Sequence, residues 1–150
     1  MILISGCLLG INCRYDGGNS LKLELLKLMK EGRAIPICPE QLGGASTPRV
    51  PCEIVGGDGL EVLEGKAKVI NSLGEDATEL FVRGAKEALK IAEISGAREA
   101  ILKERSPSCG VKETYDGSFF GKIVCGIGVT AAMLRNSGIK LWTEEKHPYC

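Results

Sequence analysis

The sequence predicts a single α/β domain over residues 1–150, with a mainly parallel sheet flanked by helices and a small β-hairpin. Short apolar runs alternate along the chain with stretches that repeat apolar residues at helical spacing, which is the pattern of strand–helix–strand units. The chain is 150 residues long and 44% hydrophobic, which suits one compact core. No repeat or low-complexity stretch divides it.

The N-terminal third contains two predicted strands with a helix between them. Residues 1–5 (MILIS) form a short apolar run that ends in a Gly-Cys turn, as expected of a buried strand. Leucines recur at helical spacing over residues 21–31, where Ser20 is the expected N-cap and Gly32 ends the helix. A second apolar run over residues 35–38 predicts the next strand.

The rest of the chain continues this alternation. Residues 60–63 and 67–70 flank a Glu-Gly-Lys turn and predict the β-hairpin. Residues 76–95 carry an apolar stripe with acidic residues at the N-terminal end, which predicts an amphipathic helix. A strand, a helix that begins with a glycine-rich turn, and a final strand are expected at residues 100–103, 126–137 and 139–143. That turn lacks the full spacing of a phosphate-binding loop, so we expect it to serve close helix–loop packing.

Composition argues against several classes of partner. Lys plus Arg and Asp plus Glu are 19 each, so the net formal charge is zero, and aromatic residues are only 5%. This balance indicates neither a basic surface for nucleic acid nor a platform of stacking rings for single strands. No apolar stretch approaches the roughly 20 residues of a membrane span, and the apolar N-terminus is too short for a signal peptide. We therefore expect a cytoplasmic protein that binds neither membranes nor intact nucleic acids, and the oligomeric state stays open.

The seven cysteines are the most informative feature of the sequence. Their odd number and the lack of a secretion signal favour reduced thiols over disulfides. Cys7, Cys38 and Cys109 lie at or just after the ends of predicted strands, and loops at one edge of a parallel sheet converge. Soft thiolates suit an iron–sulfur cluster, zinc or copper(I), and three of them leave one position of a cluster open for chemistry. The alternative is that all three pack as small hydrophobic residues in the core.

The other cysteines carry weaker signals. Cys13 follows Cys7 closely and could serve as a fourth ligand or a redox partner. Cys125 lies in an apolar run, so we expect it to pack in the core. Cys52 lies in a polar loop without supporting context, and we expect Cys150, the last residue, to be mobile.

Polar residues near these cysteines are candidates for catalysis and substrate binding. Glu40 is a candidate general acid or base. Ser106 and Ser108 either bind substrate oxygens or cap the turn in which they lie. The candidate substrate-binding residues are Arg49, Lys103 and Asp16. For the last of these, the alternative is a structural ion pair with Arg14.

Between residues 4 and 134 the chain contains, in this order, the segments SGCLLGINCRYDGG, CPEQLGG with TPR, LKERSPSCG with YDGSF, and GIGVTAAML. On these segments the chain resembles the TudS-type thiouracil desulfurase family, formerly a family of unknown function. The segment AILKERSPSCG departs mildly from the family's usual sequence.

The resemblance implies a 4Fe–4S cluster held by Cys7, Cys38 and Cys109, whose fourth iron is free to bind the sulfur of a substrate. It also implies an enzyme that converts a small thiolated pyrimidine, such as 2-thiouracil, to uracil and hydrogen sulfide by hydrolysis without a redox step. In that reaction Glu40 would deprotonate the attacking water, and Ser106 or Ser108 would orient the ring or relay protons. Two alternatives stay open, namely a non-enzymatic iron–sulfur or redox-sensing module and a zinc-binding structural domain.

Overall fold

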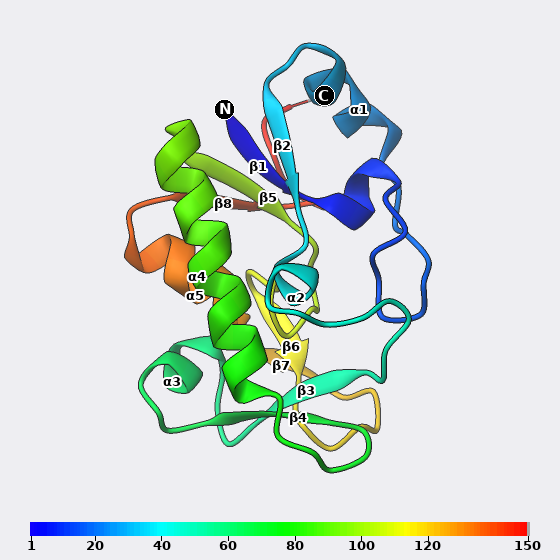
Figure 1. Cartoon of the computed structure of the whole chain (residues 1–150), viewed down its shortest axis with the longest axis vertical. Coiled ribbons are helices and arrows are strands. Elements are labelled where there is room, and N and C mark those ends of the chain that lie inside the picture. Colours follow the sequence, from blue (N-terminus) through cyan, green and yellow to red (C-terminus); the bar gives the residue numbers. More distant parts are fainter. Residues whose placement is uncertain (150) are drawn as a thin grey trace.

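The computed structural model describes residues 1–149 and has a parallel sheet at its centre (Figure 1). Its strands lie side by side in the order β2-β1-β5-β8, and each neighbouring pair is parallel. These strands are β1 (Ile2–Ser5), β2 (Ala34–Ile37), β5 (Glu99–Leu102) and β8 (Lys140–Thr143). The structure confirms the predicted α/β class. Cys150, whose expected mobility is a prediction, lies outside the described residues.

Helices cover both faces of this sheet, and the alternation of side chains along the strands decides what each face buries. The helical elements are η1 (Gly6–Leu9), α1 (Leu23–Lys30), α2 (Pro39–Leu42), α3 (Gly59–Leu63), α4 (Thr78–Ser95) and α5 (Val129–Asn136). Leu3 and Leu102 pack with α4 and α5 on one face. Ile4 and Ile101 pack with α1 on the other. No helix within residues 1–149 is both long enough and apolar enough to span a membrane.

Two antiparallel hairpins lie beyond the carboxyl edge of the sheet, in the lower half of Figure 1. One pairs β3 (Cys52–Val55) with β4 (Lys68–Asn71), and the other pairs β6 (Glu113–Tyr115) with β7 (Ile123–Cys125). A separate apolar cluster, which includes Ile54, Val69 and Phe81, joins the first hairpin to α4.

The predicted pairing of residues 67–70 with residues 60–63 in a β-hairpin was wrong. Residues 60–63 form most of α3, because Asp58 begins a helix there. The Asp58 carboxylate accepts hydrogen bonds from the backbone N–H groups of Leu60 and Glu61, and the Glu61 carboxylate accepts one from the N–H of Asp58. This capping box favours a helix over a strand. The strand at Lys68–Asn71 therefore pairs with β3.

Two smaller predictions were also wrong. Ser20 does not cap α1, which begins at Leu23; the Ser20 hydroxyl instead accepts a hydrogen bond from Arg14 at 2.6 Å. Cys125 is exposed, because β7 belongs to a two-stranded hairpin at the periphery and not to the central core. The close packing predicted for the turn before α5 is confirmed, since a Cβ added at Gly128 would lie 2.5 Å from the carbonyl carbon of Ser108.

Backbone contact between α2 and α4 fixes the segment that follows β2. A Cβ added at Gly84 would lie 1.9 Å from the carbonyl oxygen of Pro39, and one added at Gly43 would lie 2.2 Å from that of Leu80. Real Cβ atoms do not approach so closely, so both positions require glycine. This contact holds α2, which carries Glu40, against the long helix.

We predict that Gly84→Ala destabilises the protein by about 1–3 kcal/mol, because the added methyl group overpacks the α2–α4 contact. In an exposed helix the same change stabilises by about 1 kcal/mol, so the sign of the effect is diagnostic. Urea unfolding of wild type and variant measures it. Lys86→Ala, at an exposed position of the same helix, is the control and should change stability by less than about 0.5 kcal/mol. A gain in stability on Gly84→Ala would contradict the contact.

Candidate active site

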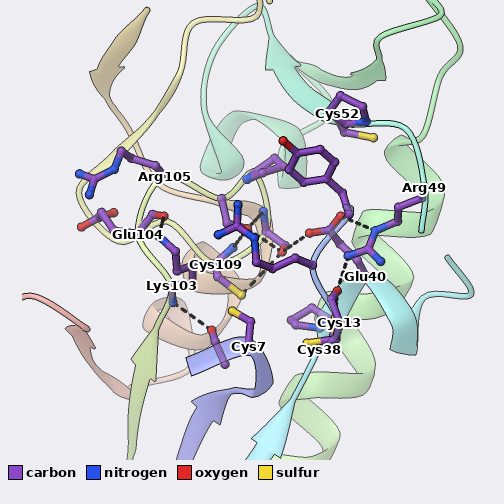
Figure 2. Close-up of a pocket in the computed structure, with 18 of the residues that line it drawn as sticks. Cys7, Cys13, Cys38, Glu40, Arg49, Cys52, Lys103, Glu104, Arg105 and Cys109 are labelled. Carbon is purple, nitrogen blue, oxygen red and sulfur yellow. Dashed lines mark hydrogen bonds and ion pairs between the residues drawn. The ribbon is translucent and has the colours of Figure 1, made fainter. Parts of the chain in front are cut away.

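A cavity of about 430 Å³ opens at the carboxyl edge of the central sheet (Figure 2). Its walls come from the loops that follow β1, β2 and β5, and from β3 and the β6–β7 hairpin. The loops that follow three neighbouring parallel strands thus meet at one edge of the sheet, which is where α/β proteins bind ligands.

The structure brings Cys7, Cys38 and Cys109 to this cavity, each by a different local device. Cys7 lies in η1, directly after β1, where Gly10 closes the turn with a left-handed φ of 86°. Cys38 is the residue between β2 and α2, where Pro39 begins the helix. Cys109 lies in the turn after β5. The predicted convergence of the three thiols is therefore observed, and their role as ligands stays a prediction.

The turn that carries Cys109 is held against the N-terminus of α5. The backbone N–H of Val129 donates to the carbonyl of Pro107 at 2.9 Å, and that of Ala131 donates to the carbonyl of Ser108 at 3.1 Å. A Cβ at Gly110 would lie 2.6 Å from the carbonyl oxygen of Glu113, so glycine is required there too. The first free N–H groups of α5 are thus used to position the cysteine and not to bind an anion.

Cys13 is a fourth thiol in the cavity; from the sequence it was only a candidate fourth ligand or redox partner. Its carbonyl accepts a hydrogen bond from the Cys38 thiol at 3.7 Å. The neighbouring side chain of Cys13, followed by burial, raises the pKa of the Cys38 thiol far above its ordinary value. Burial raises the pKa of Cys109 to about 12.

The donor chemistry of the cavity fits an iron–sulfur cluster. Cysteine thiolates are the usual ligands of such clusters, and three thiols from three loops surround one space. The raised pKa values keep the Cys38 and Cys109 thiols neutral at pH 7, so metal binding would displace their protons. Within residues 1–149, no group of three or more His, Cys, Asp or Glu is gathered closely enough to hold a single metal ion.

Glu40 lies beside these thiols in a polar network that is largely buried. Its Oε1 pairs with Nε of Arg49 at 3.1 Å, and its Oε2 accepts a hydrogen bond from the Ser108 hydroxyl at 3.3 Å. The two side chains of the ion pair are only 16% and 11% exposed. The remaining guanidinium nitrogens donate to the Cys13 carbonyl at 2.9 Å and to Thr47 Oγ1 at 2.8 Å. Arg49 thus fixes the orientation of the carboxylate.

The two serines have different surroundings. The Ser106 hydroxyl accepts hydrogen bonds from the backbone N–H groups of Ser108 and Cys109, at 3.2 and 3.0 Å, and so caps the turn. The Ser108 hydroxyl lies between Glu40 and the Cys109 sulfur, 3.6 Å from the latter. Ser108 therefore connects the carboxylate to a candidate ligand, which the sequence could not show.

Lys103 and Asp16 are placed differently from one another. Lys103 lines the cavity, but its ammonium group is paired with Glu144 at 2.9 Å. Asp16 is not among the residues that line the cavity; its carboxylate accepts the N–H of Gly18 and pairs with Arg14 at 3.5 Å. The structural ion pair anticipated for Asp16 is present. Substrate contacts by Arg49, Lys103 and Asp16 stay predictions.

Further residues line the cavity without having been predicted, among them Ser5, Glu53, Arg105, Tyr115 and Phe119. Tyr115 and Phe119 are the first and last residues of YDGSF, Ser5 begins SGCLLGINCRYDGG, and Arg105 lies in LKERSPSCG, so these segments were the available signal. Nothing local marks Glu53, which lies in the four-residue strand β3 and in none of these segments.

Comparisons with known proteins agree with this geometry. A family profile described as 2-thiouracil desulfurase matches residues 2–146. YbbK of Bacillus subtilis (strain 168), described as uncharacterized, is 49% identical over 146 residues, which are 97% of this chain and 97% of YbbK. A solved structure described as the 4Fe–4S-dependent thiouracil desulfidase TudS is 42% identical, with a TM-score of 0.88 over 98% of this chain and 92% of that one. The chain therefore belongs to the 2-thiouracil desulfurase family.

Proposed function

We propose that this protein removes sulfur from a small thiolated pyrimidine such as 2-thiouracil, giving uracil and hydrogen sulfide. The observation that carries the proposal is the meeting of Cys7, Cys38 and Cys109 in one cavity with the Glu40–Ser108 pair. Family membership and the 42% identical TudS, described as 4Fe–4S-dependent, support the same reaction and the same cofactor. The three cysteines would hold the cluster, and Cys13 would lie beside it without being a required ligand.

A 4Fe–4S cluster bound through three cysteines would supply a Lewis-acidic iron with a free position for the sulfur of the substrate. The residues of the chain supply the proton transfers. The reaction replaces a C=S bond with C=O, consumes one water and releases hydrogen sulfide, so no electrons are exchanged.

Glu40 is the proposed general base. Arg49 holds one carboxylate oxygen, and the Ser108 hydroxyl donates to the other, so the carboxylate has a fixed orientation. Glu40 takes a proton from the water that adds to the thiocarbonyl carbon and passes it to the departing sulfur, and the hydroxyl of the adduct gives up the second proton of hydrogen sulfide as the C=O bond forms. Ser108 is the proposed relay, because its hydroxyl donates to the carboxylate and lies on the side of the cavity where the cluster would be held, 3.6 Å from the Cys109 sulfur. Ser106 keeps the turn in place through the two backbone N–H groups that it accepts.

We predict that anaerobically reconstituted wild type binds about four iron and four sulfide ions and shows cluster absorbance in the visible region. Cys7→Ser, Cys38→Ser and Cys109→Ser should each lose most of this iron. Cys125→Ser, at an exposed position in β7, and Cys13→Ser, inside the cavity, should retain it. Iron and sulfide analysis with the visible spectrum makes the comparison. Failure of the wild type to bind iron would contradict the cofactor assignment.

A sulfide assay with 2-thiouracil then separates an enzyme from a module that only binds a cluster. Release of sulfide together with uracil, in equal amounts and without added reductant, supports the proposed hydrolysis. A fully loaded protein that releases no sulfide would instead support the non-enzymatic iron–sulfur alternative. Retention of zinc in place of iron, with no visible absorbance, would support the zinc-binding alternative.

We predict that Glu40→Gln lowers kcat for 2-thiouracil by about 100-fold or more, because the amide cannot accept the proton of the attacking water. The change preserves the size of the side chain and a hydrogen-bond acceptor for Arg49, so cluster content should match that of wild type. Glu64→Gln, at an exposed position outside the cavity wall, is the matched control and should have wild-type activity. Full turnover by Glu40→Gln with an intact cluster would remove Glu40 as the base.

A further inference from the structure

Three aromatic side chains, Tyr15, Tyr115 and Phe119, line the cavity among residues 1–149. The ring of Tyr15 is already engaged by the guanidinium of Arg14, which lies 6.0 Å from its centroid. Tyr115 lies in β6, where its backbone is paired in register with Ile123. Phe119 differs from both, because it lies in the turn between β6 and β7 and has an unusual backbone.

The φ of Phe119 is 61°, in the left-handed region that a bulky residue rarely adopts. Within residues 1–149 the other non-glycine residue with positive φ is Arg105, and it lines the same cavity. Such strained residues gather at functional sites, where the surrounding structure holds them in place. Glycine or asparagine would satisfy this backbone more easily, so the local conformation does not explain the phenylalanine.

Buried contacts hold Phe119 in this conformation. One carboxylate oxygen of Glu53, which is only 9% exposed, accepts hydrogen bonds from the backbone N–H groups of Gly117 and Phe119, at 2.9 and 3.2 Å. Gly117 also packs tightly on β3, since a Cβ there would lie 2.6 Å from the carbonyl oxygen of Ile54. The turn is therefore fastened to β3 at the edge of the cavity.

The neighbouring residue, Phe120, provides the contrast. Its side chain is 91% exposed and does not line the cavity, although it is the same residue type and adjacent in the chain. The turn thus separates two phenylalanines, one at the wall of the cavity and one in solvent. Being a phenylalanine in this turn is therefore not enough to bring a side chain to the cavity wall; the backbone of Phe119 places it there.

We propose that Phe119 is the ring on which the planar pyrimidine of the substrate stacks. A pyrimidine has a flat π face whether its exocyclic atom is sulfur or oxygen, and aromatic rings bind such faces by stacking. Stacking would position the heterocycle from its face, while the proton-transfer groups act at its edge. This inference rests on the proposed function, because it takes the substrate to be a thiolated pyrimidine.

The test measures the affinity of uracil, the proposed product, which is not consumed, by equilibrium dialysis with anaerobically loaded protein. We predict that Phe119→Leu, which keeps apolar bulk without the ring, raises the dissociation constant of uracil about tenfold. In turnover of 2-thiouracil, KM should rise by a similar factor while kcat stays within about twofold of wild type. Phe119→Tyr should restore both values. Phe120→Leu is the matched control and should leave both unchanged.

A second variant distinguishes the loss of the aromatic ring from a folding defect. Phe119→Asn removes the ring but tolerates the left-handed backbone, so it should fold, show the visible absorbance of the cluster and lose uracil affinity like Phe119→Leu. Equal uracil binding by wild type and both variants would overturn the stacking role. If wild type releases no sulfide but binds uracil more tightly than the variants, the proposed function fails while the stacking role stands.

Discussion

The parallel register of β1 with β2 and β5 is the constraint on which the rest of the molecule depends. Ser5 is opposite Ile37, and Ile4 is opposite Ile101, so all three strands end at one edge. The loops that follow must therefore share the space beyond that edge. Helices α1, α4 and α5 cover the two faces and leave this edge to the loops and hairpins. Positions far apart in the sequence meet because hydrophobic burial aligns the strands, and no attraction between the thiols is required.

The buried pair of Glu40 and Arg49 gives this edge its polarity. A buried ion pair gains little stability once desolvation is counted, so its contribution here is to orient groups. Arg49 contacts the Cys13 carbonyl and Glu40, while Glu40 contacts Ser108. The chain of contacts therefore ties the loops after β1, β2 and β5 together. The glycine contact between α2 and α4 supports the same arrangement from behind, because it fixes the helix that carries Glu40.

The sequence predicted the features that depend on periodicity and on a general rule of topology. The strands of the central sheet, the helix at α4 and the convergence of Cys7, Cys38 and Cys109 follow from apolar spacing and from the shared edge of parallel strands. The predicted hairpin partner was wrong because residues 60–63 suit a short strand or a helix equally, and the Asp58–Glu61 capping box favours the helix. The contact of Ser108 with Glu40 and the placement of Phe119 depend on tertiary packing between distant segments. No local pattern encodes either.

The wide separation of the three candidate ligands along the chain bears on the order of assembly. An unfolded chain would have to close two long loops before its third thiol reached a metal, and each closure costs conformational entropy. Small zinc domains avoid much of this cost by placing ligands in close pairs, and they fold around their metal. Here the apolar strands β1, β2 and β5 bring the loops together by their own burial. A cluster held by Cys7, Cys38 and Cys109 would therefore enter a fold that already exists, and its loss would leave a folded protein.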